Sequence, residues 1–258
     1  MINQTINKLF NFKGKIILIT GSSGQLGISF CKLFLDMGAI VYGFDKSSNK
    51  LKHKNFFFKK VDVSKKKIVQ NNIHLLIKIN KRIDVIINNA GFSVFTKFDK
   101  RTNNELDKTI NVNIKGTLNV INAYTEVHKT KKLKKCNIIN IGSIYGIMSP
   151  DFRIYNKNGN YNSEIYGATK AAVIQLTKYY SVILSSLNIN VNCLSPGGIY
   201  NEQNPQKPSF IKNYSSRVPK ARMANSEDLH TGIIFLASSK SDYVSGQNIL
   251  IDGGLSSW

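Results

Sequence analysis

The stretch KIILITGSSGQLG, residues 15–27, decides the fold of this chain. An apolar run, KIILIT, leads into a loop with glycines at 21, 24 and 27, and a segment of helical period follows. Glycines permit a tight turn and a close approach of a ligand to the backbone. The helix start offers free N–H groups and a favourable dipole. Between a first strand and a helix, this loop predicts a dinucleotide site. The alternative is a turn that needs its glycines only for backbone shape. The residues expected at the site are Gly21, Ser23, Gly24, Gln25, Leu26 and Gly27.

The same succession of strand and helix continues along the rest of the chain. Runs rich in Ile and Val predict strands at residues 15–20, 40–44, 56–61, 85–88, 137–143, 191–195 and 248–251. Helical period predicts helices at 26–37, 65–81, 103–128, 164–187 and 227–238. Because the strands lack polar alternation, we expect an α/β fold with a doubly wound, parallel, seven-stranded sheet flanked by helices. No repeat or low-complexity linker divides the chain, so residues 1–258 are expected to form one domain.

Composition excludes several classes of protein. A chain of 258 residues can bury a sizeable core without disulfide or metal cross-links. It has no run of 18 apolar residues, and residues 1–12 lack the features of a signal peptide. The three cysteines, Cys31, Cys136 and Cys193, are scattered and odd in number, which argues against a disulfide framework. We therefore expect a cytoplasmic protein without a membrane anchor.

The charge is strongly basic, with 36 Lys and Arg against 15 Asp and Glu, a formal net charge of +21. Nucleic acid and anionic membranes are the partners that such a charge suggests. The basic residues are nevertheless spread along the chain, apart from one run at 129–135 (KTKKLKK). No zinc spacing, RNA-binding aromatic signature or heptad repeat accompanies them. We expect a solvated surface that helps to draw anionic ligands to a cleft, without a specific nucleic acid or membrane partner.

Asp45 ends the second predicted strand, in the place where a dinucleotide site often has an acidic residue. A carboxylate there accepts hydrogen bonds from the adenosine ribose hydroxyls and repels a 2′-phosphate. This favours NAD, although the neighbouring Lys46 leaves NADP possible. The alternative is that Asp45 is a simple turn residue.

The segment YGATK, residues 166–170, lies inside a predicted helix, where positions i and i+4 share one face. A free phenol releases its proton only near pH 10, and an adjacent lysine cation stabilises the phenolate. Tyr166 beside Lys170 could therefore serve as a general acid for a ketone or a general base for an alcohol. The same spacing is common in surface pairs, so its meaning depends on the other motifs.

Further motifs follow in a fixed order along the chain. They are Asp62-Val63, NNAG at 88–91, Asn113 in VNIKG, Ser143 in NIGSIYG, Tyr166 with Lys170, PGGI at 196–199 and IDGG at 251–254. In this order the chain resembles the short-chain dehydrogenase/reductase family over nearly its full length. The resemblance implies a Rossmann fold and an NAD(P)-dependent oxidoreductase that acts on CH–OH or C=O groups.

The resemblance also implies roles for single residues. Tyr166 would donate or accept the proton, Ser143 would hydrogen-bond the reacting oxygen, and Lys170 would hold the nicotinamide ribose. Asn113 would support a water-mediated proton relay from Lys170. The implied cofactor contacts are Asp62, Val63, Asn89, Ala90, Gly91, Tyr166, Lys170, Pro196, Gly197, Gly198 and Ile199, beside the glycine loop, Asp45 and Lys46.

The family also implies a homo-oligomer, a dimer or tetramer. Its interfaces would lie along helices 103–128 and 164–187 and near the C-terminal strand. No metal is expected, because the four histidines show no ligand spacing.

Two long segments carry the expectations about substrate. Ser143 and Tyr166 lie 23 positions apart, farther than is usual in the family, and the extra residues fall within 149–161. We expect residues 146–163 to be an inserted substrate loop, with 197–225 as a substrate lid. The insertion holds Asp151, Arg153, Tyr155, Asn156 and Tyr161, and the lid holds Phe210 and Tyr214. The residues expected to contact substrate are Ser143, Tyr145, Arg153, Tyr155 and Gly198.

Arginine can fork onto a carboxylate, while Asn and Tyr suit sugar hydroxyls, so a polar small molecule, a sugar or sugar acid, is the expected substrate. A looser resemblance links the chain to a subgroup found with bacterial surface-glycan and nonulosonic acid biosynthesis. Three alternatives stay open. The insertion could pack on a neighbouring subunit, the enzyme could be a 3-oxoacyl-thioester reductase of fatty-acid synthesis, or the chain could be a non-catalytic NAD- or nucleic-acid-binding module.

Overall fold

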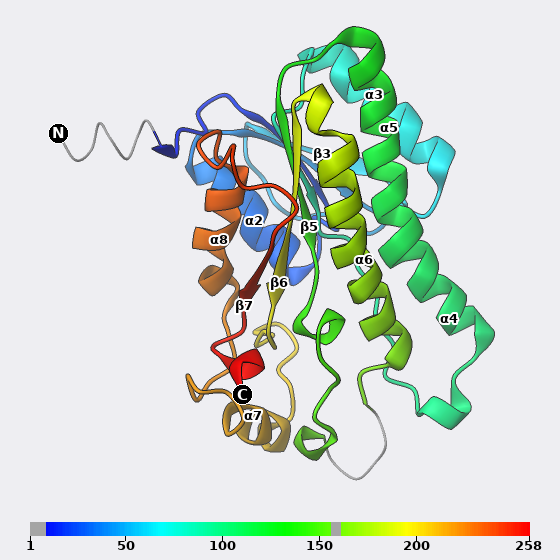
Figure 1. Ribbon diagram of the computed structural model, residues 1–258, viewed down its shortest axis with the longest axis vertical. Helices are drawn as coiled ribbons and strands as arrows, with labels where there is room; N and C mark the ends of the chain where they lie inside the picture. Colours follow the sequence, from blue (N-terminus) through cyan, green and yellow to red (C-terminus); the bar gives the residue numbers. More distant parts are fainter. Residues whose placement is uncertain (1–8, 156–160) are drawn as a thin grey trace, which may run out of the picture.

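A parallel sheet lies at the centre of the chain in the computed structural model, which describes residues 9–155 and 161–258 (Figure 1). Its seven strands have the spatial order β3-β2-β1-β4-β5-β6-β7, and every adjacent pair is parallel. The order reverses between β1 and β4, so a crevice opens beyond the carboxyl ends of these two strands. The bounds are β1 (Ile16–Thr20), β2 (Ile40–Asp45), β3 (Phe56–Lys60), β4 (Val85–Asn88), β5 (Cys136–Ile141), β6 (Ile189–Pro196) and β7 (Asn248–Ile251).

Helices cover both faces of this sheet. The described helices are α2 (Gln25–Asp36), α3 (Lys66–Asn80), α4 (Asn103–Ile110), α5 (Gly116–Lys131), α6 (Glu164–Ile183), α7 (Pro208–Ser215) and α8 (His230–Ala237). Figure 1 shows α2 and α8 on one face and α3, α5 and α6 on the other. Side chains of β1 alternate between the two faces. Ile17 and Ile19 pack with α2 and α8, whereas Leu18 packs with α3 and α5. All three are fully buried, which explains the unbroken apolar run in the sequence.

The predicted doubly wound, seven-stranded parallel sheet is confirmed, with small shifts at the ends of the strands. One part of the reasoning was wrong. β3 and β7 lie at the two edges of the sheet, so their side chains are partly exposed rather than buried on both faces. The expected helix over 103–128 is also interrupted. A turn of π-helix, Asn111–Lys115, separates α4 from α5.

The segment 197–225, expected to be a substrate lid, contains the helix α7. Its first residue, Pro208, has a backbone shape that suits a helix start and no N–H group to leave unpaired. Phe210, Ile211 and Tyr214 form an apolar face that packs against Ile154 of the insertion. In Figure 1, α7 lies beyond the carboxyl ends of β6 and β7.

Two further findings concern the expectations from composition. The three cysteines are buried and free. In the described ranges, no helix is both long and apolar enough to cross a lipid bilayer.

Candidate active site

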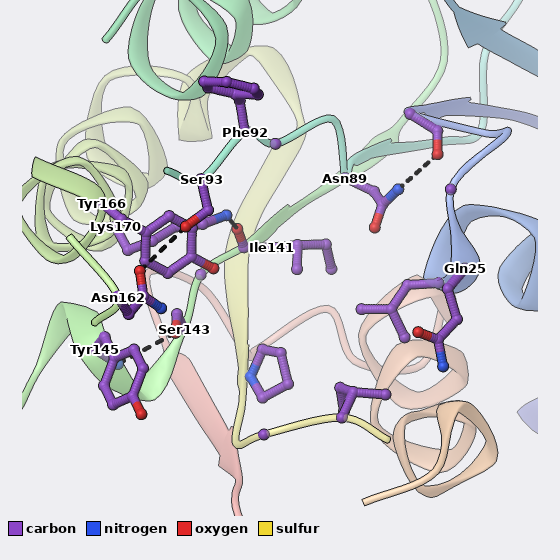
Figure 2. Close-up of a pocket in the computed structure, with 18 of the residues that line it drawn as sticks. Gln25, Asn89, Phe92, Ser93, Ile141, Ser143, Tyr145, Asn162, Tyr166 and Lys170 are labelled. Atoms are coloured by element: carbon purple, nitrogen blue, oxygen red, sulfur yellow. Dashed lines mark hydrogen bonds between the residues drawn. The ribbon is translucent and has the colours of Figure 1, made fainter. Parts of the chain in front are cut away.

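A cavity of about 510 Å³ opens at the carboxyl ends of the strands, where the strand order reverses. Figure 2 shows residues of this cavity, with Ser143, Tyr145, Tyr166 and Lys170 gathered on one side and Gln25 on the other. It collects most of the cofactor residues expected from the sequence. These are Gly21, Gly24, Gln25, Leu26, Gly27, Asp45, Asn89, Gly91, Tyr166, Lys170, Pro196, Gly197, Gly198 and Ile199.

The other expected cofactor residues lie around an adjoining hollow of about 80 Å³, with one exception. Lys46, Asp62, Val63 and Ala90 line this hollow, which shares Gly21, Asp45 and Gly91 with the larger cavity. Ser23 lines neither space. Its amide donates to the Asp45 carboxylate at 2.9 Å and its hydroxyl donates to the carbonyl of Ser47 at 3.2 Å.

The glycine loop is shaped by close backbone contacts. Gly21 has φ +63°, and a Cβ atom there would lie 2.7 Å from the Cα of Ala90. A Cβ atom on Gly27 would lie 2.0 Å from the carbonyl oxygen of Gly21, so only glycine fits where α2 crosses the loop. α2 begins after Gly24 with no acidic residue in its first turn. Its first N–H groups are therefore free for an anion, and this arrangement fits the pyrophosphate of a dinucleotide.

The Asp45 carboxylate helps to hold the glycine loop in shape. One oxygen accepts from the amide of Ser23 at 2.9 Å, and the other accepts from the amide of Ser47 at 2.8 Å. Each carboxylate oxygen can accept a second hydrogen bond. Asp45 can therefore receive ribose hydroxyls while it also fixes the loop.

Tyr166 and Lys170 lie one turn apart on α6 and face the cavity. The Lys170 ammonium lies 5.7 Å from the centre of the Tyr166 ring and donates to the carbonyl of Ile141 at 2.7 Å. Lys170 is only 5% exposed. Ser143, two residues beyond the end of β5, is also buried, and its hydroxyl oxygen accepts a hydrogen bond from the amide of Tyr145 at 3.2 Å. A phenol, an ammonium group and a hydroxyl thus line one wall, and these are groups that can bind and move a proton.

Asn113 lies behind this wall, on the π-helical turn, and is 1% exposed. Its side-chain oxygen accepts from the amide of Phe92 at 2.8 Å, and its nitrogen donates to the carbonyl of Phe92 at 3.0 Å. The same nitrogen donates to the Thr169 hydroxyl at 2.9 Å. A π-helical turn often marks a functional site, because it redirects one side chain out of the helical register. Here it directs the amide of Asn113 toward the segment after β4 and toward α6.

A second cavity of about 380 Å³ adjoins the first and brings together three of the expected substrate residues, Tyr145, Tyr155 and Gly198. The Tyr145 and Tyr155 hydroxyls are 3.4 Å apart. Burial raises the pKa of both phenols, so both remain neutral hydrogen-bonding groups. The remaining lining residues are Phe95, Asn162, Ile199, Gln206, Lys207, Phe210, Tyr214 and Met223.

The structure does not bring Arg153 to either cavity, and the expectation for this residue needs correction. Its side chain is 72% exposed and lies in a two-point ion pair with Asp151. The guanidinium lowers the pKa of the Asp151 carboxyl. A carboxylate two residues away therefore holds Arg153 on the surface. Asn156, also expected near substrate, lies outside the described residues.

Sequence reasoning missed several lining residues. Phe92, Ser93 and Phe95 follow the NNAG motif and line the larger cavity, and the Ser93 hydroxyl donates to Asn162 at 3.1 Å (Figure 2). Their position directly after a motif was the only available signal. Gln206, Lys207 and Met223 lie in the expected lid, 197–225, but the sequence did not single them out within it. The described residues contain no group of three His, Cys, Asp or Glu that could hold a metal ion.

Comparisons with known proteins bear directly on this site. The Enoyl-(Acyl carrier protein) reductase family model matches residues 26–256. A 3-oxoacyl-(acyl-carrier-protein) reductase of Thermotoga maritima is 34% identical over 255 residues, which cover 94% of this chain and 98% of that protein. The chain belongs to the short-chain dehydrogenase/reductase family. This short-chain dehydrogenase/reductase is therefore an NAD(P)-dependent oxidoreductase.

Solved structures of the family extend the comparison. A short-chain dehydrogenase from Leptospira borgpetersenii with bound NAD+ has a TM-score of 0.89 at 39% identity, over 95% of this chain and 94% of that chain. A gluconate 5-dehydrogenase from Burkholderia cenocepacia, in complex with NADP and tartrate, has a TM-score of 0.84 at 26% identity, over 98% and 99%. Both cofactors thus occur among similar structures of this family.

Proposed function

We propose that this short-chain dehydrogenase/reductase transfers a hydride between nicotinamide and a hydroxyl or keto carbon of a sugar or sugar acid, in surface-glycan biosynthesis. The observation that carries the proposal is the wall of the 380 Å³ cavity. It combines aromatic rings, which can pack on the apolar face of a sugar ring, with the polar groups of Tyr145, Asn162 and Lys207. Few polar groups at fixed places in an aromatic cavity are typical of a small-molecule site.

The chemistry follows from the wall that Ser143, Tyr166 and Lys170 form. When bound, the nicotinamide supplies or accepts the hydride. Ser143 donates a hydrogen bond to the reacting oxygen, and Tyr166 gives its proton to a ketone or takes one from an alcohol. Lys170 uses one N–H for the Ile141 carbonyl, so two remain for ribose hydroxyls. Its ammonium lies 5.7 Å from the centre of the Tyr166 ring, on the same wall as the phenol. Asn113 holds Phe92 and supports the proton relay from behind.

We propose NAD as the preferred cofactor. The Asp45 carboxylate lines both cofactor spaces, where it would repel a 2′-phosphate. Two cations oppose this effect. The ammonium groups of Lys46 and Lys108 lie 6.0 Å and 4.3 Å from the centre of the Phe92 ring, and Lys46 and Phe92 line the same hollow. NADP therefore remains a candidate.

A 3-oxoacyl-thioester reductase is the second candidate, and the Thermotoga maritima relative favours it. The net charge of +21 would also help an acidic carrier protein to approach.

Oligomerisation belongs to the proposal as well. On α6, Tyr179, Val182 and Ile183 are exposed apolar side chains, as expected if a second copy covers this helix.

Turnover tests separate these functions. Purified enzyme would be assayed for oxidation of NADH and NADPH with a panel of keto sugars and keto sugar acids, and with acetoacetyl thioesters. The proposal expects turnover with the sugar panel and little with thioesters. Faster turnover of thioesters with NADPH would establish the second candidate instead. Cofactor binding without turnover of either class would favour the non-catalytic module.

A further inference from the structure

The inserted segment and the lid are joined by aromatic side chains. The Tyr155 and Phe210 ring centres lie 5.4 Å apart, and the Phe210 and Tyr214 rings are stacked at 5.9 Å. Tyr155 belongs to the insertion, whereas Phe210 and Tyr214 lie on α7. Ile154, which is buried, belongs to the same cluster. The described part of the insertion therefore packs on the lid helix rather than standing free in solvent.

A second contact joins the same two segments. Arg217, directly after α7, lies 3.6 Å from the Asp151 carboxylate, so that Asp151 has both Arg153 and Arg217 beside it. The pKa of Asp151 is lowered by its hydrogen bonds to Arg153 and by the charges of both arginines. The contact is partly exposed, so it adds little to stability.

Tyr214 connects this aromatic cluster to Gly198, which lines the cofactor cavity. The amide of Gly198 donates a hydrogen bond of 2.5 Å to the Tyr214 hydroxyl. Tyr214 is 3% exposed, and burial raises its pKa to about 12, so the phenol stays neutral. A Cβ atom on Gly198 would lie 2.6 Å from the Cζ of Tyr214, so the ring needs glycine at this position.

Backbone contacts also hold the segment that Tyr214 contacts. The amide of Gly197 donates to the carbonyl of Ile251 on β7 at 2.9 Å, and Ile199 forms a parallel bridge with Ala224. The carbonyl of Gly198 accepts from the amide of Ala224 at 3.0 Å, and the carbonyl of Ile199 accepts from the Gln206 side chain at 2.8 Å. Gly198 and Ile199 line both the cofactor cavity and the substrate cavity. The amide and carbonyl of Gly198 and the carbonyl of Ile199 are therefore held by Tyr214, Ala224 and Gln206 of the lid.

We infer that Tyr214 is a positioning residue for the nicotinamide end of the cofactor, and that Tyr155 and Phe210 brace it. Tyr214 does not line the cofactor cavity, so it acts through the Gly198 amide. The inference rests on the proposed cofactor site.

The test compares two ligands that differ at one end. NADH reaches the nicotinamide end of the cavity, whereas ADP-ribose has the adenosine, the pyrophosphate and the second ribose but lacks the nicotinamide ring. Both dissociation constants would be measured by calorimetry for the wild type and for Tyr214→Phe. Loss of one neutral hydrogen bond should weaken NADH about fivefold, which corresponds to about 1 kcal/mol, and leave ADP-ribose unchanged.

Two further variants make the test specific. Phe210→Leu keeps the Tyr214 hydroxyl but removes the ring between it and Tyr155, so it should also weaken NADH selectively. Tyr42→Phe is the matched control. Tyr42 is a buried tyrosine whose hydroxyl contacts Asn80, and it lines neither cofactor space. This variant should leave both ligands unchanged. If Tyr214→Phe does not fold, Phe210→Leu still carries the test.

The outcomes distinguish failure of the inference about Tyr214 from failure of the proposed cofactor site. Equal weakening of NADH and ADP-ribose by Tyr214→Phe would show a general structural role and overturn the inference, and so would unchanged NADH binding in both lid variants. If the wild type binds neither ligand, the proposed cofactor site itself is refuted. If the wild type binds both ligands and the variants bind them equally well, only the inference fails.

Discussion

Replacement of Lys170 by methionine should remove activity and leave the fold almost as stable as before. Lys170 is 5% exposed, and its ammonium donates to one acceptor, the Ile141 carbonyl. Among the ion pairs of the described residues, none includes Lys170. The protein therefore keeps a nearly buried cation without a carboxylate beside it. Such a group costs stability, as expected if Lys170 has the catalytic role that we propose.

The expected magnitude follows from two opposing changes. Loss of a hydrogen bond from a charged group costs about 1.5–3 kcal/mol. Removal of a poorly paired cation from the interior returns a desolvation cost on the order of several kcal/mol. Because methionine has a similar length and is apolar, we expect a net change within about 1 kcal/mol. For a chain of this size that is a shift of about 2–4 °C in melting temperature. Turnover should fall by about 10²–10⁴.

The assay pairs thermal unfolding with steady-state kinetics. Lys178→Met is the control, because Lys178 is an exposed lysine on the same helix, α6, and lines neither cavity. This control should retain wild-type turnover. The stabilisation that NADH gives to the wild type should be smaller in Lys170→Met, because ribose contacts are lost. A fall in melting temperature of more than about 10 °C would make Lys170 a structural residue and refute the reasoning. Turnover within tenfold of wild type would refute its role in proton transfer.

Three further predictions test the site and its surroundings. Tyr166→Phe should lower turnover by at least about 10² while NADH still binds, as checked by kinetics and fluorescence titration; unchanged turnover would contradict the mechanism. Asp45→Ala should shift the ratio of NADPH to NADH affinity toward NADPH, and an unchanged ratio would show that Asp45 only shapes the loop. Arg222 lowers the pKa of Asp228 to about 2, so this pair stabilises the fold above pH 4 and the contribution is lost as pH falls from 4 to 2. Asp228→Asn should lower the free energy of unfolding by about 1 kcal/mol at pH 7 and leave it unchanged near pH 2. A difference in melting temperature between wild type and variant that stays constant from pH 7 to pH 2 would contradict the assignment.

The sheet could be predicted because its physical cause is local. Strands buried on both faces need unbroken apolar runs, and Ile16–Thr20 and Val85–Asn88 have them. α7 could not be predicted in the same way. It has eight residues, and its apolar face becomes visible only when Ile154 of a distant segment packs against it. The π-helical turn at Asn111–Lys115 has no sequence signal either, since it depends on where the Asn113 amide finds its partners.

The cofactor side of the site was accessible to sequence reasoning for a similar reason. Glycines, Asp45 and the NNAG segment are tied to backbone geometry, which leaves a fixed spacing in the chain. The substrate side is formed by single side chains from unrelated segments, such as Phe95, Asn162 and Met223. For Arg153 the error is the reverse, because the sequence predicted a substrate contact for a side chain that lies on the surface. Its chemistry suited an anionic substrate, but the Asp151 carboxylate two residues away offers a nearer partner.

The irregular segments in the walls of the site share one feature, which is that side chains from other parts of the chain hydrogen-bond to their backbone groups. Asn113 pairs with both the amide and the carbonyl of Phe92, and Tyr214 accepts from the amide of Gly198. Asp45 does the same for the amide of Ser23 in the glycine loop. Backbone groups that have no strand partner are thus paired with side chains that belong to rigid elements behind them. Such pairing preorganises the site, so we expect substitutions at Asn113 and Tyr214 to impair function before they impair folding.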